Sequence, residues 1–80
     1  MKPISKISYS ELQTLFNRNI HFTSDCEFFP NFNIIATLLS YKITKTEIVF
    51  EVKVLSNNKF ITIGSNMKNL QFEIINIDIK

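Results

Sequence analysis

Four residues close together in the chain carry side chains that metal sites and thiol enzymes use. They lie within seven residues of one another: His21, Asp25, Cys26 and Glu27. A structural zinc site needs paired cysteines and histidines at short spacing, whereas this sequence holds one cysteine and one histidine. A structural cysteine beneath a helix and a solvated histidine explain the group better than a ligand set or a nucleophile with its base. We therefore expect no metal and no cofactor here.

Other catalytic arrangements are also missing from the sequence. Gly64 is the only glycine, so a glycine-rich loop that could cradle a phosphate is impossible. No serine, histidine and acid can be singled out as a hydrolytic set. The sequence therefore predicts a protein that is not an enzyme.

The length and composition of the chain indicate one folded domain. Eighty residues is about half of the ~150 residues expected per domain, so we treat residues 1–80 as a single globular domain. A hydrophobic fraction of 45% beside 20% charged residues excludes a disordered tail. A domain of this size buries only about 60% of its unfolded surface, so it needs its apolar residues or a partner.

The cysteine count and the first residues favour a cytoplasmic location. One cysteine cannot form an internal disulfide, whereas small secreted domains usually depend on several. The start, MKPISK, has no apolar stretch behind its charge, and no apolar run approaches the ~18 residues of a membrane helix. The bias toward Ile, Asn, Lys and Phe, which A/T-rich codons encode, suggests an A/T-rich genome, cellular or viral, and a phage or another mobile element is one such source.

The segment 47–64 predicts a β-hairpin at the centre of the fold. Its apolar residues alternate with charged ones and fall on one face of a strand: Ile48, Phe50, Val52 and Val54. Asn57 and Asn58 tolerate the positive φ that a two-residue hairpin turn needs. A turn at these two residues pairs Val54 with Ile61, which agrees with the hydrophobic pattern.

A short helix is predicted before this hairpin. Ser8 and Glu11 match a capping box, in which the serine hydroxyl accepts from the Glu11 amide and the Glu11 carboxylate reaches back. An apolar stripe of Leu12, Leu15 and Phe16 follows, so the helix is expected over about 9–18 and must lie on the sheet.

The segments between the helix and the hairpin are harder to assign. Residues 20–31 contain turn-forming side chains and a proline, and are predicted as a loop or an irregular edge strand. Residues 32–43 have apolar positions at helical spacing, but their length also suits a buried strand. A tight turn at Thr44 and Lys45 would pair Leu39 with Phe50, so we favour a strand, with a helix as the alternative.

These elements predict an α+β fold, in which the short N-terminal helix packs on a four-stranded antiparallel β-meander. The last strand covers 69–80, and its apolar face changes between Ile74 and Ile75, so a β-bulge is expected there. Such a sheet can also curl toward a small barrel. In either form the helix shelters one face only.

The opposite face of this sheet is too apolar for an ordinary solvated surface. Three explanations remain open: closure into a barrel, a symmetric homodimer, or a second protein that docks there. Phe28 and Phe29 lie in the loop beside this face, where they either plug the core or anchor an interface. The predicted interface residues are Ile34, Leu38, Val49, Leu55, Phe60, Phe28 and Phe29.

The sequence thus favours a non-catalytic protein-binding module, such as a small inhibitor or an assembly subunit. Its partner would be another protein or a second copy of the chain. The alternative is a small β-rich domain that binds nucleic acid on sheet aromatics such as Tyr41 and Phe60. The nine basic residues are scattered, however, and Arg18 is the only arginine, so nucleic acid is the less favoured partner.

Overall fold

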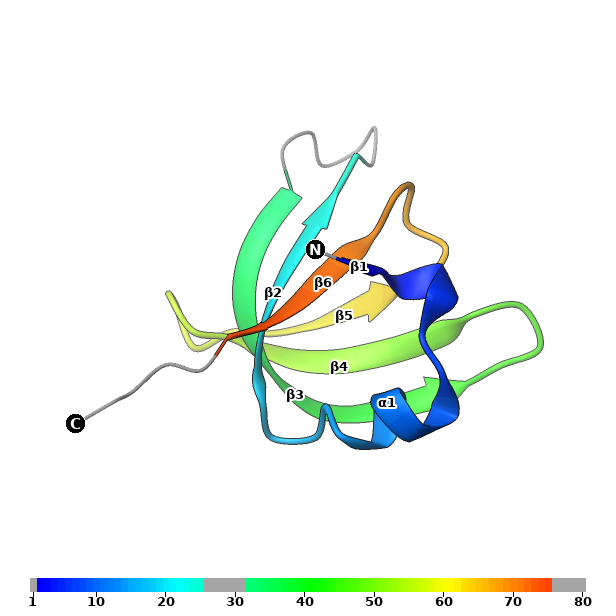
Figure 1. Cartoon of the computed structure of the whole chain (residues 1–80). Coiled ribbons are helices and arrows are strands. Elements are labelled where there is room, and N and C mark those ends of the chain that lie inside the picture. Colours follow the sequence, from blue (N-terminus) through cyan, green and yellow to red (C-terminus); the bar gives the residue numbers. More distant parts are fainter. Residues whose placement is uncertain (1, 26–31, 76–80) are drawn as a thin grey trace.

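The computed structural model describes residues 2–25 and 32–75 of the chain. These residues form one antiparallel sheet with two short helical segments before its second strand (Figure 1). The elements are β1 (Lys2–Pro3), the 3-10 helix η1 (Ile4–Lys6), α1 (Tyr9–Gln13), β2 (Asn19–Ser24), β3 (Phe32–Ile43), β4 (Ile48–Val54), β5 (Phe60–Gly64) and β6 (Gln71–Ile75).

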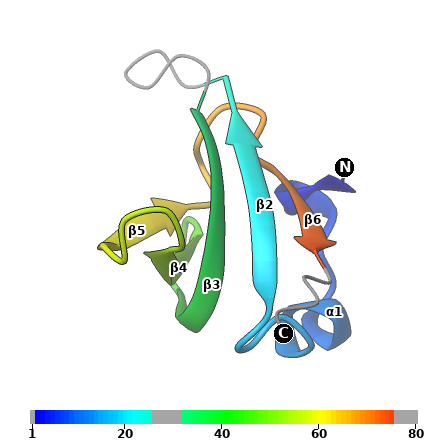
Figure 2. The same ribbon diagram turned by 90° about the vertical axis from the view of Figure 1, so that its left-hand side faces the viewer.

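The sheet has six strands in the order β1-β6-β2-β3-β4-β5. The strands bend strongly, so that β4 and β5 turn away from the plane of β2 and β6 (Figures 1 and 2). Over the described residues the sheet is not closed, because β1 and β5 are its two edges and do not pair with each other. An antiparallel sheet with a short N-terminal helix was predicted correctly, but closure into a barrel is not observed.

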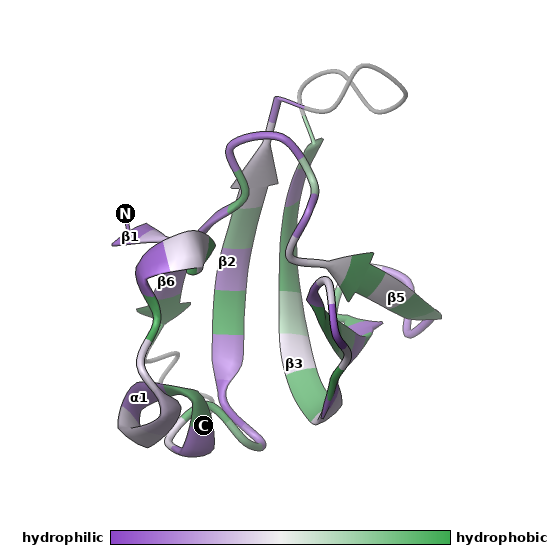
Figure 3. Ribbon diagram, turned by 90° about the vertical axis from the view of Figure 1, so that its right-hand side faces the viewer, coloured by the Kyte–Doolittle hydropathy of each residue, from purple (hydrophilic) through white to green (hydrophobic). Residues whose placement is uncertain are grey.

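The predicted four-stranded meander is wrong in its last step. β3, β4 and β5 follow one another as hairpins, but β6 pairs with β2 and β1 at the other side of the sheet. The reason is that the first part of segment 20–31 forms a central strand, β2, between β3 and β6. Ile20, Phe22 and Ser24 are buried in alternation along this strand. Figure 3 shows hydrophobic and hydrophilic bands that alternate along much of β2.

Residues 32–43 form a strand, as pairing favoured, but its register contains an unpredicted β-bulge. Leu38 lies opposite Val52 and Ser40 lies opposite Glu51, so Leu39 is an extra residue on β3. Before the bulge the even-numbered residues of β3 face the core, and after it the odd-numbered ones do. The predicted pair of Leu39 with Phe50 is therefore wrong, and Tyr41 takes that position.

The bulge lies where the exit of the helix meets β3. The amide of Asn17 donates to the Leu38 carbonyl at 2.9 Å, and the Leu38 amide donates to the Arg18 carbonyl at 3.1 Å. Asn17 has a positive φ of 58°, which turns the chain out of the helical region and into β2. Beyond the bulge Tyr41 turns inward, and its ring lies 5.0 Å from that of Phe16.

The predicted hairpin is present, with a different turn. β4 and β5 pair Val52 with Ile61, two residues away from the predicted register, and the loop between the strands holds five residues, 55–59. Asn58 has a φ of 57°, and the Asn57 side chain accepts from the Lys59 amide at 3.0 Å. A shift of two residues leaves every side chain on its predicted face, because strands alternate with a period of two.

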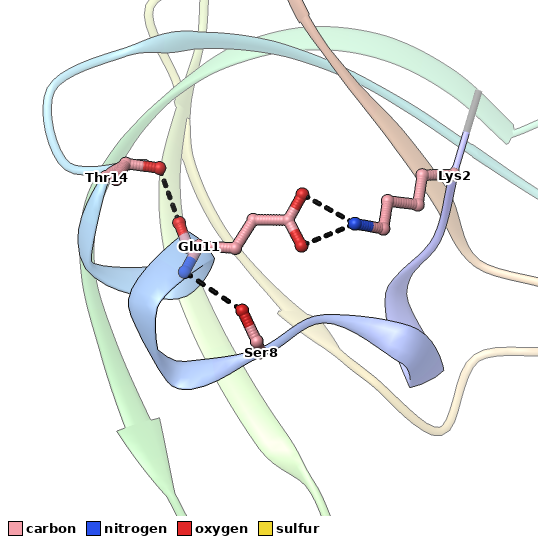
Figure 4. Close-up of polar contacts among 4 residues, drawn as sticks. All are labelled: Lys2, Ser8, Glu11 and Thr14. Atoms are coloured by element: carbon pink, nitrogen blue, oxygen red, sulfur yellow. Dashed lines mark hydrogen bonds and ion pairs between the residues drawn. The ribbon is translucent and has the colours of Figure 1, made fainter.

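The helix begins as predicted and ends earlier. The Ser8 hydroxyl accepts from the Glu11 amide at 3.2 Å, which confirms this half of the capping box (Figure 4). The Glu11 carboxylate instead accepts from Lys2 at 2.6 and 2.8 Å and ties the helix to the N-terminal strand. α1 ends at Gln13, and turns carry the chain on to Asn17.

The last strand is regular over its described length. β6 pairs with β2 in one continuous register through Ile74 and Ile75, so the bulge predicted between these two residues is absent. Residues 76–80 lie outside the described part of the chain.

The core lies on the inner face of the curved sheet, beneath α1 and η1. It contains apolar residues from each of β2 to β6, closed at one side by residues of the two helical segments. Its members are Ile4, Leu12, Leu15, Ile20, Phe22, Ala36, Leu38, Phe50, Val52, Ile63, Leu70 and Phe72.

The bulge predicts losses of stability of very different size at two adjacent leucines. Leu38→Ala is expected to lower the free energy of unfolding by about 2–5 kcal/mol, since Leu38 is fully buried. Leu39→Ala is expected to lower it by less than about 1 kcal/mol, because Leu39 faces outward. Urea unfolding of both variants measures the difference. Equal losses, or a larger loss for Leu39→Ala, would contradict the position of the bulge.

Candidate interaction surface

The face of β3, β4 and β5 that points away from the core is the candidate site. Over much of its length this face carries polar residues, as expected for a solvated sheet face. Four large apolar side chains interrupt this polar surface, and we call them the outer patch: Ile35, Leu39, Leu55 and Phe60.

Phe60 is the most exposed large apolar side chain in the described part of the chain. Its exposed fraction is 72%, and that of Leu39 is 39%. Both side chains line one shallow depression of about 130 Å³, which lies over β4 and also includes Glu51 and Thr62. The bulge creates this arrangement, because it puts Leu39 on the outer face within reach of the edge strand.

Ile35 and Leu55 form the other end of the outer patch. The Leu55 amide donates to the Ile35 carbonyl at 3.0 Å, which fixes the start of the β4–β5 loop against β3. The two residues line a groove of about 440 Å³ together with Asn33, Ile34 and Ser56, among others. The outer patch therefore joins an open groove at one end to the Phe60 edge at the other.

Charged and hydroxyl side chains surround the apolar residues. Lys53 lies directly opposite Phe60 in the sheet, between it and Thr37 of β3. The Ser40 hydroxyl donates to the Glu51 carboxylate at 3.0 Å beside the depression. An apolar centre with a polar rim of this kind is the usual composition of a protein–protein interface.

The predicted interface residues fall into different places in the structure. Phe60 and Leu55 lie on the outer patch, and Val49 is half-buried on the same face between Lys42 and Gly64. Leu38 is fully buried in the core, so it is not available to a partner. Ile34 points to the inner face and is partly covered, although it lines the groove at its edge.

Phe28 and Phe29 lie outside the described residues. Sequence reasoning missed Ile35 and Leu39, because the pairing without a bulge placed both in the core. The adjacent leucines at 38 and 39 are the only sign of the bulge in the sequence, since a pair of equal apolar residues lets either one face inward.

The group of His21, Asp25, Cys26 and Glu27 is described only in part. His21 Nε2 is hydrogen-bonded to Asn33 Oδ1 across the outer face of β2 and β3. The Asp25 carboxylate accepts from Asn69 Nδ2 at 2.9 Å. Among the described residues no three acidic, histidine or cysteine side chains come together in a way that could hold a metal ion. Cys26 and Glu27 lie outside the described part.

A second exposed apolar group lies around the helix. Tyr9 is 68% exposed, and it lines a small pocket of about 170 Å³ with Ile7 and Ile43, among others. These side chains belong to the end of the molecule where α1 covers the core. Tyr9 can serve as a control position for the outer patch, because it is an exposed aromatic residue similar in size to Phe60.

Comparison of the chain with family models, with curated proteins and with solved structures found no match.

Neither helical segment in the described residues has the length or the hydropathy to cross a bilayer.

The exposure of Phe60 predicts that the fold does not need this side chain. Phe60→Ala is expected to change the free energy of unfolding by less than about 0.5 kcal/mol, as for other surface positions. The control is Phe50→Ala, which removes a fully buried ring on the neighbouring strand and is expected to lower stability by about 3–5 kcal/mol. Urea unfolding compares the two. A loss of 2 kcal/mol or more for Phe60→Ala would mean that its ring supports the core.

Proposed function

We propose that this protein is a non-catalytic protein-binding module and that the outer patch is its contact surface. The observation that carries the proposal is the position of Phe60, which is largely exposed beside Leu39 at the edge of the sheet. Large exposed aromatic residues surrounded by a polar rim are the residues that dominate binding energy in protein interfaces.

The fold leaves the large apolar side chains of Phe60 and Leu39 in contact with water. Burial of each large apolar side chain is worth roughly 1.5–3 kcal/mol, so a partner that covers Phe60 and Leu39 gains several kcal/mol. The core is complete without them, since Phe50 and Val52 fill the inner face beneath. A small domain has few such residues to spare, which favours a use for them outside the fold.

The partner is another protein or a second copy of this chain, and the role is that of an inhibitor or an assembly subunit. The residue bias toward A/T-rich codons supports a phage or mobile-element source, and the single cysteine supports the cytoplasm as its compartment. An inhibitor of a host protein would occlude a site on that protein by covering it with the outer patch.

Binding of single-stranded nucleic acid is the second candidate, and one local feature favours it. Lys53 lies opposite Phe60, so a base stacked on the ring would have a cation beside its phosphate. Glu51 lines the same depression, however, and its carboxylate repels a phosphate at that point. Protein binding therefore remains the first proposal.

The proposal is tested by capture of proteins from the native host with a tagged chain. Phe60→Glu is expected to lower recovery of the specific partner at least about tenfold, because a buried carboxylate replaces the ring at the centre of the contact. Tyr9→Glu is the matched control, since it puts the same charge on an equally exposed aromatic position on α1. Mass spectrometry of the eluates measures recovery.

Two results would contradict the proposal. Equal recovery by the wild type and Phe60→Glu would show that the outer patch does not contact the partner. Equal loss with Tyr9→Glu would show an effect of charge alone. Recovery that disappears after nuclease treatment would instead support the nucleic-acid function.

A further inference from the structure

The edge strand β5 presents unpaired backbone groups in a defined pattern. In the described residues it pairs with β4 on one side and ends the sheet on the other. The Val54 amide donates to the Lys59 carbonyl at 2.8 Å, and the Ser65 amide donates to the Ile48 carbonyl at 2.8 Å. Because hydrogen-bonded pairs alternate in an antiparallel ladder, these two bonds fix the direction of every backbone group between them.

Ile61 and Ile63 therefore direct their amides and carbonyls toward β4. Phe60, Thr62 and Gly64 direct theirs away from the sheet, toward the free edge, where the Gly64 carbonyl already accepts from the Met67 amide at 3.1 Å. Sheet edges are usually protected by lysine, proline or a bulge within the strand, and β5 contains none of these. At the opposite edge of the sheet, β1 is two residues long, ends in Pro3 and covers only Gln71 and Phe72 of β6.

We propose that β5 pairs antiparallel with β5 of a second copy of the chain, about a two-fold axis at Thr62. The inference rests on the proposed protein-binding function. It identifies a second copy of the chain as the partner that contacts the Phe60 end of the outer patch. Such a contact is isologous, because the same strand contributes both sides, and it joins two sheets into one continuous sheet.

The hydrogen-bonding pattern selects the register. Only the outward residues 60, 62 and 64 can bond across the edge, so an outward residue must face an outward residue. When Thr62 faces Thr62 of the second copy, every outward residue has an outward partner. This gives about six hydrogen bonds, with each Gly64 carbonyl accepting from Phe60 of the other copy as well as from Met67 of its own. A shift of two residues in either direction leaves one outward residue of each copy without a partner and reduces the number to about four.

The side chains suit the same register. On the outer face Phe60 lies opposite Gly64 of the second copy, which has no side chain, so the ring can lie over the glycine backbone. On the inner face Ile61 lies opposite Ile63, and both are apolar and β-branched. The Glu47 carboxylate of that copy lies where a Cβ on Gly64 would be, so this flexible side chain must move aside for the ring.

The charges permit this contact. No residue between Phe60 and Gly64 is charged. Lys59, the nearest lysine in the sequence, would face Ser65 of the second copy and not another lysine. The strand is short, so the interface is small, and we expect a dimer that forms at micromolar concentrations and dissociates on dilution.

Thr62→Pro tests the proposal without disturbing the fold. The Thr62 amide points to the free edge, so a proline there removes no bond to β4, and edge strands tolerate proline. Two hydrogen bonds of the dimer are lost, and the proline ring blocks the approach of the second copy. Thr62→Val is the matched control, because it keeps the backbone amide and the shape of the side chain.

Sedimentation equilibrium of the purified proteins measures the dissociation constant of the dimer. We expect a dimer for the wild type and for Thr62→Val, and a dissociation constant raised by roughly 30-fold or more for Thr62→Pro. Circular dichroism and thermal unfolding show whether each variant keeps its fold. A wild type that stays monomeric up to about millimolar concentration, or a dimer unaffected by Thr62→Pro in a folded protein, would overturn the proposal.

A crosslinking experiment tests the register and remains informative if Thr62→Pro fails to fold. In a Cys26→Ser background, Thr62→Cys is expected to give a high yield of dimer with a short bis-maleimide, because the two-fold axis brings the two cysteines together. Thr46→Cys in the exposed β3–β4 turn is the control and is expected to give little dimer. Equal yields at both positions, or closed assemblies larger than two copies, would overturn the two-fold pairing.

The two proposals fail in different ways. A monomeric wild type that still captures a host protein through Phe60 would overturn the β5 pairing and leave the binding function in place. A β5 dimer that captures no other protein would support the pairing and limit the binding function to self-association.

Discussion

The backbone contact between the helix exit and Leu38 is the constraint on which the rest of the structure depends. The Asn17 amide donates to the Leu38 carbonyl and the Leu38 amide donates to the Arg18 carbonyl, and β3 leaves its pairing with β2 at that point. One extra residue, Leu39, is accommodated where β3 continues along β4 alone. The bulge also adds local twist, which contributes to the curvature that surrounds the core.

Several features of the molecule follow from this contact. Leu38 fills the core on one side of the bulge, and Tyr41 faces Phe16 on the other. Leu39 is left on the outer face, next to the edge strand that carries Phe60. The arrangement that completes the core therefore also produces an exposed apolar patch, and the protein-binding proposal depends on both.

The sequence predicted the local elements well and their assembly less well. Three elements follow from interactions between residues that are close in the sequence: the cap at Ser8, the strand over 32–43 and the hairpin around Asn58. The position of β6 could not be predicted in this way, because it depends on β2, a strand of six residues that was expected to be a loop or an edge strand.

The candidate site was predicted in part for a related reason. Phe60 lies on the expected face because a register shift of two residues preserves the alternation along β4 and β5. Leu38 and Leu39 exchanged places because a single-residue bulge reverses the alternation, and two adjacent leucines satisfy either pattern equally. The choice between them is made by a backbone contact with Asn17, twenty-one positions earlier in the chain, which strand periodicity cannot reveal.

The most direct test of this account measures which of the two leucines meets solvent. In a protein with isotopically labelled leucine methyl groups, a soluble paramagnetic agent broadens the NMR signals of exposed methyls more than those of buried ones. The account predicts strong broadening for Leu39 and almost none for Leu38. The reverse order would contradict it, because the bulge and the outer patch would then both be misplaced.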